Sequence, residues 1–382
     1  MDQLLTNLRT QIDEIDCNIT KLFNQRMKVS GEIAQIKKDN ELPVINRARE
    51  REVLCKAVEQ SDDDMESYIK ILYYTLFDLS RSYQNRLFAQ QSSLTENIKN
   101  AIESTSKQFP KKATVACQGV DGAYSQQAAD RFFSLPGIMN FRTFEGVFQA
   151  VESGLCKYGV LPIENSTAGS VNQVYDMMKH YKFYIAKSLR LRIDHCLLTK
   201  PGTKMENITE VYSHDQAISQ CDHFFKSNPD VRVTICENTA IAAKLVAESD
   251  RNDVAAISSR ECAGLYDLCV ISDDVQNNKN NYTRFICISK EMEIYPGSNK
   301  TSIMLLIPHK PGSLYNVIAK FASCDMNLTK LESRPVPGKD FEFLFYFDME
   351  GSIYDPSVIT LISELSNDYE QFTYLGSYSE MV

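Results

Sequence analysis

The chain contains 382 residues, of which 43% are hydrophobic and 24% charged, and its formal net charge is −9. This composition is that of an average globular protein with two or three domains, so it excludes disordered, fibrous and low-complexity classes. It contains no run of eighteen apolar residues, and an acidic chain without a basic block is a poor nucleic-acid binder. The polar start and eleven cysteines without a CxxC pair predict a cytoplasmic protein with free thiols.

The first segment, residues 1–91, is predicted to be all-helical. Apolar side chains recur at steps of three and four residues from Leu5 to Ile36, which indicates one helix of more than thirty residues. Pro43 ends it, and two further helices are expected before Gln91. Three helices cannot bury so long a stripe within one chain. We therefore expect an intertwined homodimer or a higher homo-oligomer.

Two cations lie within this apolar stripe. Lys37 follows Arg26 by eleven residues, about three helical turns, so both side chains lie near one face. Burying an unpaired cation costs several kcal/mol, so this face needs an anion. An internal salt bridge, or snorkelling at the helix end, is the alternative for a single cation. Two cations, followed by Arg49 and Glu50 in the next helix, favour an anion-binding pocket.

Three other polar side chains are candidates for the same pocket. Arg9 precedes Arg26 by seventeen residues and points about 100° away around the helix, so it is expected to reach the pocket of a partner protomer. Ser80 and Gln84 form an i,i+4 pair on one face of the third helix and can donate hydrogen bonds to an oxygen atom.

Four stretches of this segment, LTNLR (5–9), NQRMKVSGEIAQIK (24–37), PVINRAREREV (43–53) and DLSRSYQ (78–84), resemble the all-helical chorismate mutases. The resemblance implies a pocket lined by Arg26, Lys37, Arg49, Ser80 and Gln84, with Glu50 at the substrate hydroxyl and Arg9 from the other protomer. Asn46 stands where many members have Asp, for which we expect altered affinity and retained activity.

The chemistry of that family suits such a pocket. Chorismate rearranges to prephenate without acid, base or nucleophile, so the site must hold a dianion in its compact conformer and stabilise charge on the ether oxygen. Arginines suit the carboxylates, and Lys37 and Gln84 suit the ether oxygen. No metal or cofactor is expected.

Residues 92–112 are polar and predict a linker, and residues 113–290 alternate short β-branched runs with helical segments, which predicts an α/β domain. The stretch LPIENSTAGS (161–170) would place hydroxyls and backbone amides at a helix N-terminus, as an anion cradle. Spacing alone predicts only a small-anion cleft between two lobes. Ser166 and Thr167 as plain helix caps and His214 as a satisfied polar side chain remain alternatives.

Five motifs occur in order: G-x-x-G-x-Y-S from Gly119, P-I-E-N-S from Pro162, D-H-C-L from Asp194, Y-S-H-x-Q from Tyr212 and T-R-F from Thr283. Together they resemble prephenate dehydratases. The resemblance implies that Thr283 supplies the key hydroxyl, that Arg284 pairs with a substrate carboxylate, and that the cleft is shaped by Tyr124, Ser125, Glu164, Asn165, Ser166, Thr167, Gln216 and Glu237. Either Glu164 or Glu237 would protonate the departing hydroxyl if burial raised its pKa.

The last segment, residues 300–378, has the order β-α-β-β-α-β, which is the ferredoxin-like topology. HKPGSLYNVIAKF (309–321) and LTKLESRPVPG (328–338) resemble phenylalanine-responsive ACT regulatory domains. The resemblance implies an effector site of Gly312, Ser313, Leu314, Glu332, Ser333 and Arg334. Without it, a plain turn at Gly312 and a surface ion pair between Glu332 and Arg334 would be favoured.

The resulting hypothesis is a multidomain enzyme that combines both reactions, with chorismate and prephenate as substrates and phenylalanine as inhibitor. It joins an all-α domain, a two-lobed α/β domain and a ferredoxin-like α+β domain. Two alternatives stay open: a dehydratase acting on arogenate, and a non-catalytic amino-acid sensor of the same fold. Neither a nucleic acid nor a membrane is an expected partner.

Overall fold

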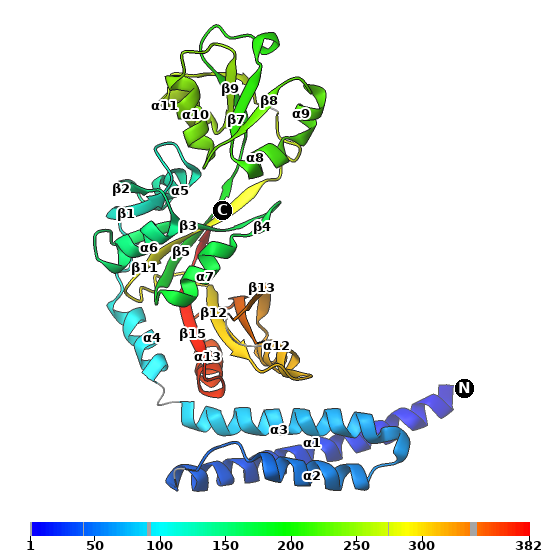
Figure 1. The fold of residues 1–382 in the computed structure, drawn as a ribbon. Coiled ribbons are helices and arrows are strands. Elements are labelled where there is room, and N and C mark those ends of the chain that lie inside the picture. The colour runs from blue at the N-terminus through cyan, green and yellow to red at the C-terminus, as the bar shows by residue number, and fades with distance from the viewer. Residues whose placement is uncertain (1, 41, 90–92, 274, 337–341) are drawn as a thin grey trace.

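The computed structural model describes residues 2–40, 42–89, 93–273, 275–336 and 342–382. Figure 1 shows a helical hairpin at one end, an α+β domain beside it, and a two-lobed α/β domain at the other end. Among the described residues, no helix has both the length and the apolar character needed to cross a bilayer. The expected ends at residues 1, 91 and 92, and Pro337 and Gly338 of the second regulatory motif, lie outside this description.

The N-terminal domain is helical throughout, as predicted. Its elements are α1 (Asp2–Asp39), α2 (Arg47–Glu59), the short 3-10 helix η1 (Asp63–Met65) and α3 (Glu66–Ala89). The break after α1 contains Pro43, and α2 begins where the side chain of Asn46 accepts a hydrogen bond from the backbone N–H of Arg49 at 3.0 Å. Helix α3 packs against both α1 and α2.

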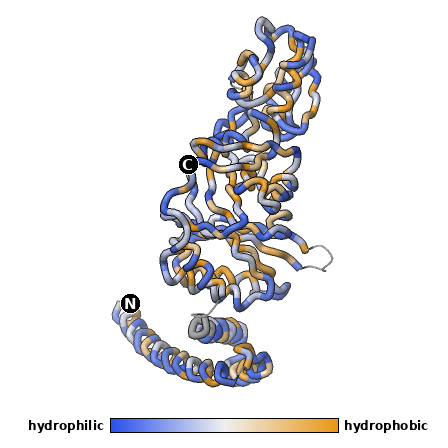
Figure 2. The backbone as a smooth tube through the Cα atoms, turned by 90° about the vertical axis from the view of Figure 1, so that its left-hand side faces the viewer, coloured by the Kyte–Doolittle hydropathy of each residue, from blue (hydrophilic) through white to orange (hydrophobic). Residues whose placement is uncertain are grey.

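The apolar stripe of α1 is left uncovered within the described chain. Leu5, Leu8, Ile12, Ile15 and Ile19 keep between 48% and 57% of their surface exposed. Figure 2 shows this part of α1 standing away from the rest of the chain. A run of large apolar side chains of this length on a helix is typical of a surface that another protein segment covers.

The expected linker at 92–112 contains a helix, α4 (Ser93–Ser104), which corrects that prediction. Its apolar residues Leu94, Ile98, Ala101 and Ile102 recur at helical spacing, and Ile98 is fully buried in the core of the C-terminal domain. The many polar residues of the segment cover the outer face of this helix, which is why composition alone indicated a linker.

The α/β domain consists of two lobes, each built on its own sheet. The first lobe contains β1 (Lys112–Gln118), α5 (Tyr124–Phe132), β2 (Leu135–Phe141), α6 (Phe144–Glu152), β3 (Tyr158–Asn165), β4 (Gly169–Ser170), α7 (Asn172–His180), β5 (Tyr184–Arg192) and β11 (Tyr282–Ser289). Its strand order is β16-β5-β11-β3-β1-β2, with β4 beside β3. The added strand β16 (Glu380–Met381) comes from the C-terminus and pairs with β5.

The second lobe is inserted between β5 and β11. It contains β6 (Cys196–Thr199), η2 (Met205–Asn207), β7 (Glu210–Ser213), α8 (Asp215–Gln220), α9 (Asp222–Ser227), β8 (Arg232–Ile235), α10 (Thr239–Glu248), β9 (Val254–Ser258), α11 (Arg260–Leu265) and β10 (Cys269–Ser272). Its strand order is β10-β6-β9-β7-β8. The chain passes between the lobes twice, and the two connections are joined by a hydrogen bond from Ile193 N to Asn281 O at 2.8 Å.

The C-terminal domain has the predicted order of elements. It contains β12 (Lys300–Ile307), α12 (Ser313–Ser323), β13 (Asn327–Pro335), β14 (Phe343–Glu350), α13 (Pro356–Asp368) and β15 (Phe372–Tyr378). The antiparallel sheet has the order β13-β14-β12-β15, which is the ferredoxin-like topology.

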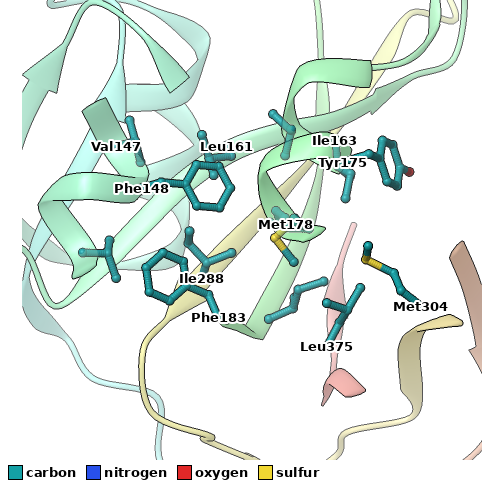
Figure 3. Close-up of a cluster of buried hydrophobic side chains, with 14 of the residues drawn as sticks. Val147, Phe148, Leu161, Ile163, Tyr175, Met178, Phe183, Ile288, Met304 and Leu375 are labelled. Carbon is teal, nitrogen blue, oxygen red and sulfur yellow. The ribbon is translucent and has the colours of Figure 1, made fainter. Parts of the chain in front are cut away.

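The first lobe and the C-terminal domain share one hydrophobic core. Figure 3 shows Ile163 and Tyr175 of the lobe in the same cluster as Met304 and Leu375 of the C-terminal sheet. All four side chains are at least 97% buried. These two parts therefore form one packed body, with the open face of the C-terminal sheet against the lobe.

Candidate active sites

A cavity of about 630 Å³ lies between the three helices of the N-terminal domain. Seven of the residues predicted for the first site line it: Arg26, Lys37, Asn46, Arg49, Glu50, Ser80 and Gln84. Arg9 does not line it; it lies seventeen residues before Arg26, about 25 Å along the helix axis. The helical spacing therefore brings seven of the predicted side chains together around one cavity within one chain, and Arg9 lies apart from them.

The two cations of the stripe have no carboxylate partner among the described residues. The guanidinium of Arg26 donates to Ser80 Oγ and, at 3.1 Å, to the carbonyl oxygen of Leu76, and Lys37 Nζ donates to the carbonyl oxygen of Val44. Partial burial lowers the pKa of both groups, and for Lys37 the charge of Glu50 opposes that effect. The alternative of an internal salt bridge is thus not what the structure shows.

Gln84 offers an unused hydrogen-bonding group to this cavity. Its Nε2 atom donates to Ser30 Oγ at 2.9 Å, while Oε1 is buried without a partner among the described residues. Because a hydroxyl both donates and accepts, turning the amide over keeps the bond to Ser30 and presents an N–H instead. The site can therefore offer either a donor or an acceptor at this point.

The sequence reasoning missed Arg81, which also lines the cavity. Arg81 forms ion pairs with Glu50 and Asp78. Burial lowers the pKa of Arg81, but the two carboxylates outweigh it and the net shift is upward. Glu50, expected at the substrate hydroxyl, is thus held by a cation of α3. Arg49 is 62% exposed and pairs with Glu52 at 2.7 Å, so it is free to exchange that partner for a ligand.

A second cavity, of about 730 Å³, lies between the two lobes of the α/β domain. Six of the predicted residues line it: Tyr124, Ser125, Asn165, Gln216, Glu237 and Thr283. They come from the first turn of α5, the end of β3, the start of α8, the loop before α10 and the start of β11. The cavity thus lies beside the two chain connections that join the lobes.

Thr283 is held by a network of amide side chains. Asn165 Nδ2 donates to Thr283 Oγ1 at 2.9 Å and to Asn281 Oδ1 at 2.8 Å. Asn165 Oδ1 accepts from the backbone N–H groups of Thr167 and Ala168 at 3.0 and 2.8 Å, which fixes the amide orientation. Because Thr283 Oγ1 accepts from Asn165, its own hydrogen is left to donate into the cavity.

His195, Gln220 and Asn281 complete this network and were not among the predicted residues. Asn281 Nδ2 donates to Gln220 Oε1 at 2.9 Å, and His195 Nε2 lies 2.9 Å from the same oxygen. Burial lowers the pKa of His195, an effect that the Gln220 contact opposes, so the imidazole is neutral at pH 7. The motif D-H-C-L contained the signal for His195, but only the fold places the two crossings side by side.

Two predicted residues of this site lie on the opposite face of the sheet, which corrects their assignment. Arg284 forms a buried ion pair with Asp348 of the C-terminal domain, and Glu164 pairs with Lys330 at 3.1 Å. Successive residues of a strand point to opposite faces, so Thr283 in the cavity requires Arg284 on the other side. Of the two candidate acids, only Glu237 lines the cavity, and Arg142, which was missed, is a cation that does.

Ser166 and Thr167 also lie outside this cavity. The hydroxyl of Ser166 donates to the carbonyl oxygen of Asn280 at 3.2 Å and accepts from the backbone N–H of Tyr282 at 3.0 Å, so it fastens the β3 end to the β11 start. Thr167 lines a neighbouring cavity that shares Gln216 and Gln220 with the first.

The predicted effector residues form two separate groups within one chain. Gly312 has φ +81°, a left-handed conformation that favours glycine, at the start of α12, and it is followed by Ser313 and Leu314. Glu332 accepts from Ser170 Oγ at 2.7 Å and Arg334 pairs with Asp176 of α7 at 2.8 Å, with Ser333 between them on the edge strand β13. Ser313 and Arg334 line different cavities.

Comparison with known proteins gives the following similarities. Residues 8–85 match the family model of chorismate mutase type II and residues 115–293 that of prephenate dehydratase. The chain is 32% identical over 376 residues to a bifunctional chorismate mutase/prephenate dehydratase of Aquifex aeolicus, covering 98% of this chain and 97% of that protein. It is 36% identical over 299 residues to arogenate dehydratase/prephenate dehydratase 2 of Arabidopsis thaliana, covering 75% of this chain and 76% of that protein.

A solved structure is similar as well. The prephenate dehydratase of Arthrobacter aurescens, determined in complex with L-Phe, matches with a TM-score of 0.64 and 26% identity, over 70% of this chain and 89% of that chain.

Proposed function

The chain belongs to the bifunctional chorismate mutase/prephenate dehydratases, and from this premise we propose how its own residues carry the two reactions. The enzyme rearranges chorismate to prephenate and then converts prephenate to phenylpyruvate. The second reaction takes up one proton and releases water and CO2. The product of the helical domain is thus the substrate of the α/β domain.

In the helical pocket, Arg26 and Lys37 bind the dianion. The observation that carries this proposal is that both cations are partly buried without a carboxylate partner among the described residues. A bound dicarboxylate supplies the missing charge and is held in its compact conformer. Lys37 and Gln84 then stabilise the charge that grows on the ether oxygen as its bond to carbon breaks.

The functional unit of the mutase is a dimer in which the stripe of α1 is covered by a second copy. The exposed run from Leu5 to Ile19 supports this, and it would bring Arg9 to the partner's pocket. Ile15→Glu should give a monomer with little mutase activity, measured by size-exclusion chromatography and chorismate consumption. Asn24→Glu, nine residues further along the same helix and on its opposite face, is the control and should remain a dimer. A fully active monomeric Ile15→Glu variant would contradict the proposal.

In the α/β cleft, the hydroxyl of Thr283 donates a hydrogen bond to the departing hydroxyl of prephenate. Asn165 supports this role because it occupies the acceptor side of Thr283 Oγ1. Glu237 delivers the proton that turns the leaving group into water, and Arg142 binds a carboxylate of the substrate. The ring carboxylate then leaves as CO2, and its bonding electrons complete the aromatic ring.

The direct test is a coupled assay of the purified chain. Chorismate should disappear, prephenate should form and decay, and phenylpyruvate should accumulate in an amount equal to the chorismate consumed. If neither chorismate loss nor phenylpyruvate formation is observed, the proposed roles of both sites are wrong.

A second candidate substrate for the cleft is arogenate, in which an amino group replaces the side-chain keto group of prephenate. The similarity to the Arabidopsis arogenate dehydratase/prephenate dehydratase favours testing it. With both substrates present in equal amounts, the ratio of phenylalanine to phenylpyruvate gives the preference directly. We expect phenylpyruvate to predominate.

The C-terminal domain is an ACT domain that binds phenylalanine as inhibitor, with Gly312, Ser313 and Leu314 of one chain and Glu332, Ser333 and Arg334 of another. The solved relative with L-Phe supports the ligand, and the separation of the two groups within one chain supports a site between chains. Phenylalanine should raise the melting temperature, and Arg334→Ala should reduce that rise.

Asp176→Ala is the matched control for that variant, because it removes the same ion pair but leaves Arg334 available to the ligand. An equal loss of the phenylalanine response in both variants would assign the effect to the ion pair and would contradict a ligand role for Arg334.

A further inference from the structure

Two neighbouring strands carry the dehydratase site on one face and a set of charged groups on the other. On β11, Thr283 faces the cleft and Arg284 faces the C-terminal domain; on β3, Asn165 faces the cleft and Glu164 faces the C-terminal domain. The strands pair in register here, Thr283 opposite Asn165 and Arg284 opposite Glu164. Thr283 and Asn165 are therefore each one peptide bond away from a residue that contacts the C-terminal domain.

A β-bulge lies directly beside this register. The pairing shifts between Arg284 and Phe285, which lies opposite Pro162, so that β3 has one residue more than β11 at this point. As a result, Ile163 and Glu164 both face the C-terminal domain, Ile163 in the shared core and Glu164 in its ion pair with Lys330. Such bulges re-aim side chains and recur next to active sites.

Arg284 is the most strongly anchored of these groups. It is 7% exposed, and its partner Asp348, on β14 of the C-terminal domain, is fully buried. Asp348 Oδ1 accepts from Ser302 Oγ on the adjacent strand β12, and the hydroxyls of Tyr378 and Tyr346 lie 2.7 and 3.2 Å from the same Ser302 oxygen. The carboxylate that binds Arg284 is thus held by Ser302 of the neighbouring strand, whose hydroxyl is in turn fixed by tyrosines of β14 and β15.

The buried ion pair at this interface is weak evidence of a contribution to stability. The adjoining contact is an apolar core that includes Ile163, Tyr175, Met304 and Leu375 (Figure 3). Replacing a buried pair by apolar residues of similar size is often neutral for stability, whereas removing one partner alone is strongly destabilising because it leaves the other charge buried and unpaired. What the pair adds to such a core is a fixed distance and orientation between two atoms, since charged hydrogen bonds are directional.

We propose that Arg284 and Asp348 are positioning residues through which the C-terminal domain fixes strand β11 and so places the hydroxyl of Thr283 in the dehydratase cleft. The proposal rests on the proposed role of Thr283. The same pair would also transmit the effect of phenylalanine bound to the C-terminal domain. A shift of β14 relative to the lobe would move β11, because the ion pair cannot lengthen without separating two buried charges.

The test compares the double variant Arg284→Met/Asp348→Leu with the wild-type full chain. The double variant removes both charges together, so we expect a melting temperature near that of the wild type and unchanged mutase activity. Its dehydratase kcat should fall about 10- to 100-fold with KM changed less than about threefold, because substrate still binds but the hydroxyl is misplaced. The phenylalanine concentration that halves dehydratase activity should rise about tenfold or more.

The matched control is Lys300→Met/Glu380→Leu. This pair, with both side chains 7% exposed at 2.9 Å, also joins the C-terminal domain to the same sheet, but Glu380 lies on β16, opposite Ser188 of β5 and not beside Thr283. We expect wild-type kcat and a wild-type phenylalanine response. Ser302→Ala, which removes only one hydrogen bond to Asp348, is the milder second variant if the double variant does not fold, with a kcat reduced about two- to tenfold.

Wild-type kcat and phenylalanine response in the Arg284→Met/Asp348→Leu variant would overturn the proposal, as would an equal loss in the Lys300→Met/Glu380→Leu control. For Ser302→Ala, an unchanged kcat would do the same. A wild-type chain that makes no phenylpyruvate from prephenate would instead refute the proposed function itself, so the two failures are distinguishable.

Discussion

The two proposed reaction sites of this chain are built by opposite means. The proposed mutase pocket is a set of charged side chains on helices, in which Arg26 and Lys37 have no carboxylate partner within the part of the chain that the structure describes. The dehydratase cleft is a set of mostly neutral hydrogen-bonding groups on strand ends and interlobe connections, centred on Asn165 and Thr283. A rearrangement that needs only binding and charge stabilisation can use the first design, whereas expulsion of a hydroxyl needs donors placed at one leaving group.

The largest effect that would sharpen this contrast concerns the two acids of the dehydratase motifs. Glu237→Gln should lower dehydratase kcat about 100- to 10,000-fold, because it removes the proposed proton donor in the cleft. Glu164→Gln should not affect proton delivery, since its side chain lies across the sheet beside Lys330. Rates of phenylpyruvate formation from prephenate test this, with mutase activity as the internal control for folding. An equal loss of kcat in both variants would contradict the proposal that Glu237 is the proton donor and that Glu164, on the opposite face of the sheet, is not.

Removing a charge from the mutase pocket should have the next largest effect. Lys37→Met should lower kcat/KM for chorismate about 100- to 1000-fold, because one of the proposed donors to the ether oxygen is lost. The dehydratase, assayed with added prephenate, should be unchanged. A loss below about tenfold would show that Lys37 is a structural cation that its bond to the Val44 carbonyl already satisfies.

The pH dependence should also separate the sites. Burial lowers the pKa of Lys37 from its ordinary value of 10.5, and in the proposed mechanism it is the charged form that binds the dianion. The mutase kcat/KM should therefore fall as pH rises, and the fall should begin below pH 10.5. Lys37→Arg should move this alkaline limb to higher pH, because guanidinium keeps its proton. An alkaline limb at the same pH in both proteins would assign it to another group.

The smallest expected effect concerns Asn46. Its side chain caps α2 by accepting from Arg49 N at 3.0 Å, and Asp can make the same bond. Asn46→Asp should therefore preserve or slightly raise stability, by up to about 1 kcal/mol from the helix dipole, while KM for chorismate changes only a few-fold. Thermal unfolding and mutase kinetics measure both. Loss of activity would show that the neutral amide is required in this pocket.

The helical part of this molecule was largely predictable, because the rotation of 100° per residue fixes which side chains share a face. Arg26 and Lys37 were found in this way, and Arg81 was missed because its pairing with Glu50 depends on how α2 packs against α3. Helix α4 was missed because polar residues outnumber its buried face. The order of elements in the C-terminal domain followed from local patterns, but its shared core with the first lobe did not.

The sequence motifs predicted which segments form the dehydratase cleft. They did not predict which face of the sheet each motif residue points to. Thr283 and Arg284 were placed in one site because they are adjacent in a motif, whereas adjacent strand residues point to opposite sides. The bulge at Ile163 and Glu164 leaves no mark in the sequence pattern. His195 and Asn281 both contact Gln220 Oε1, which depends on the two interlobe crossings lying side by side although they are more than eighty residues apart in the chain. Long-range topology, rather than local preference, decides these contacts.

The most direct test of the account is a paired measurement on Arg26→Ala and Thr283→Ala in the full chain. Arg26→Ala should fail to consume chorismate and still convert added prephenate to phenylpyruvate. Thr283→Ala should convert chorismate to prephenate, which then accumulates. Loss of both activities from either single substitution, or of neither, would contradict the claim that the Arg26 cation serves one reaction and the positioned Thr283 hydroxyl the other.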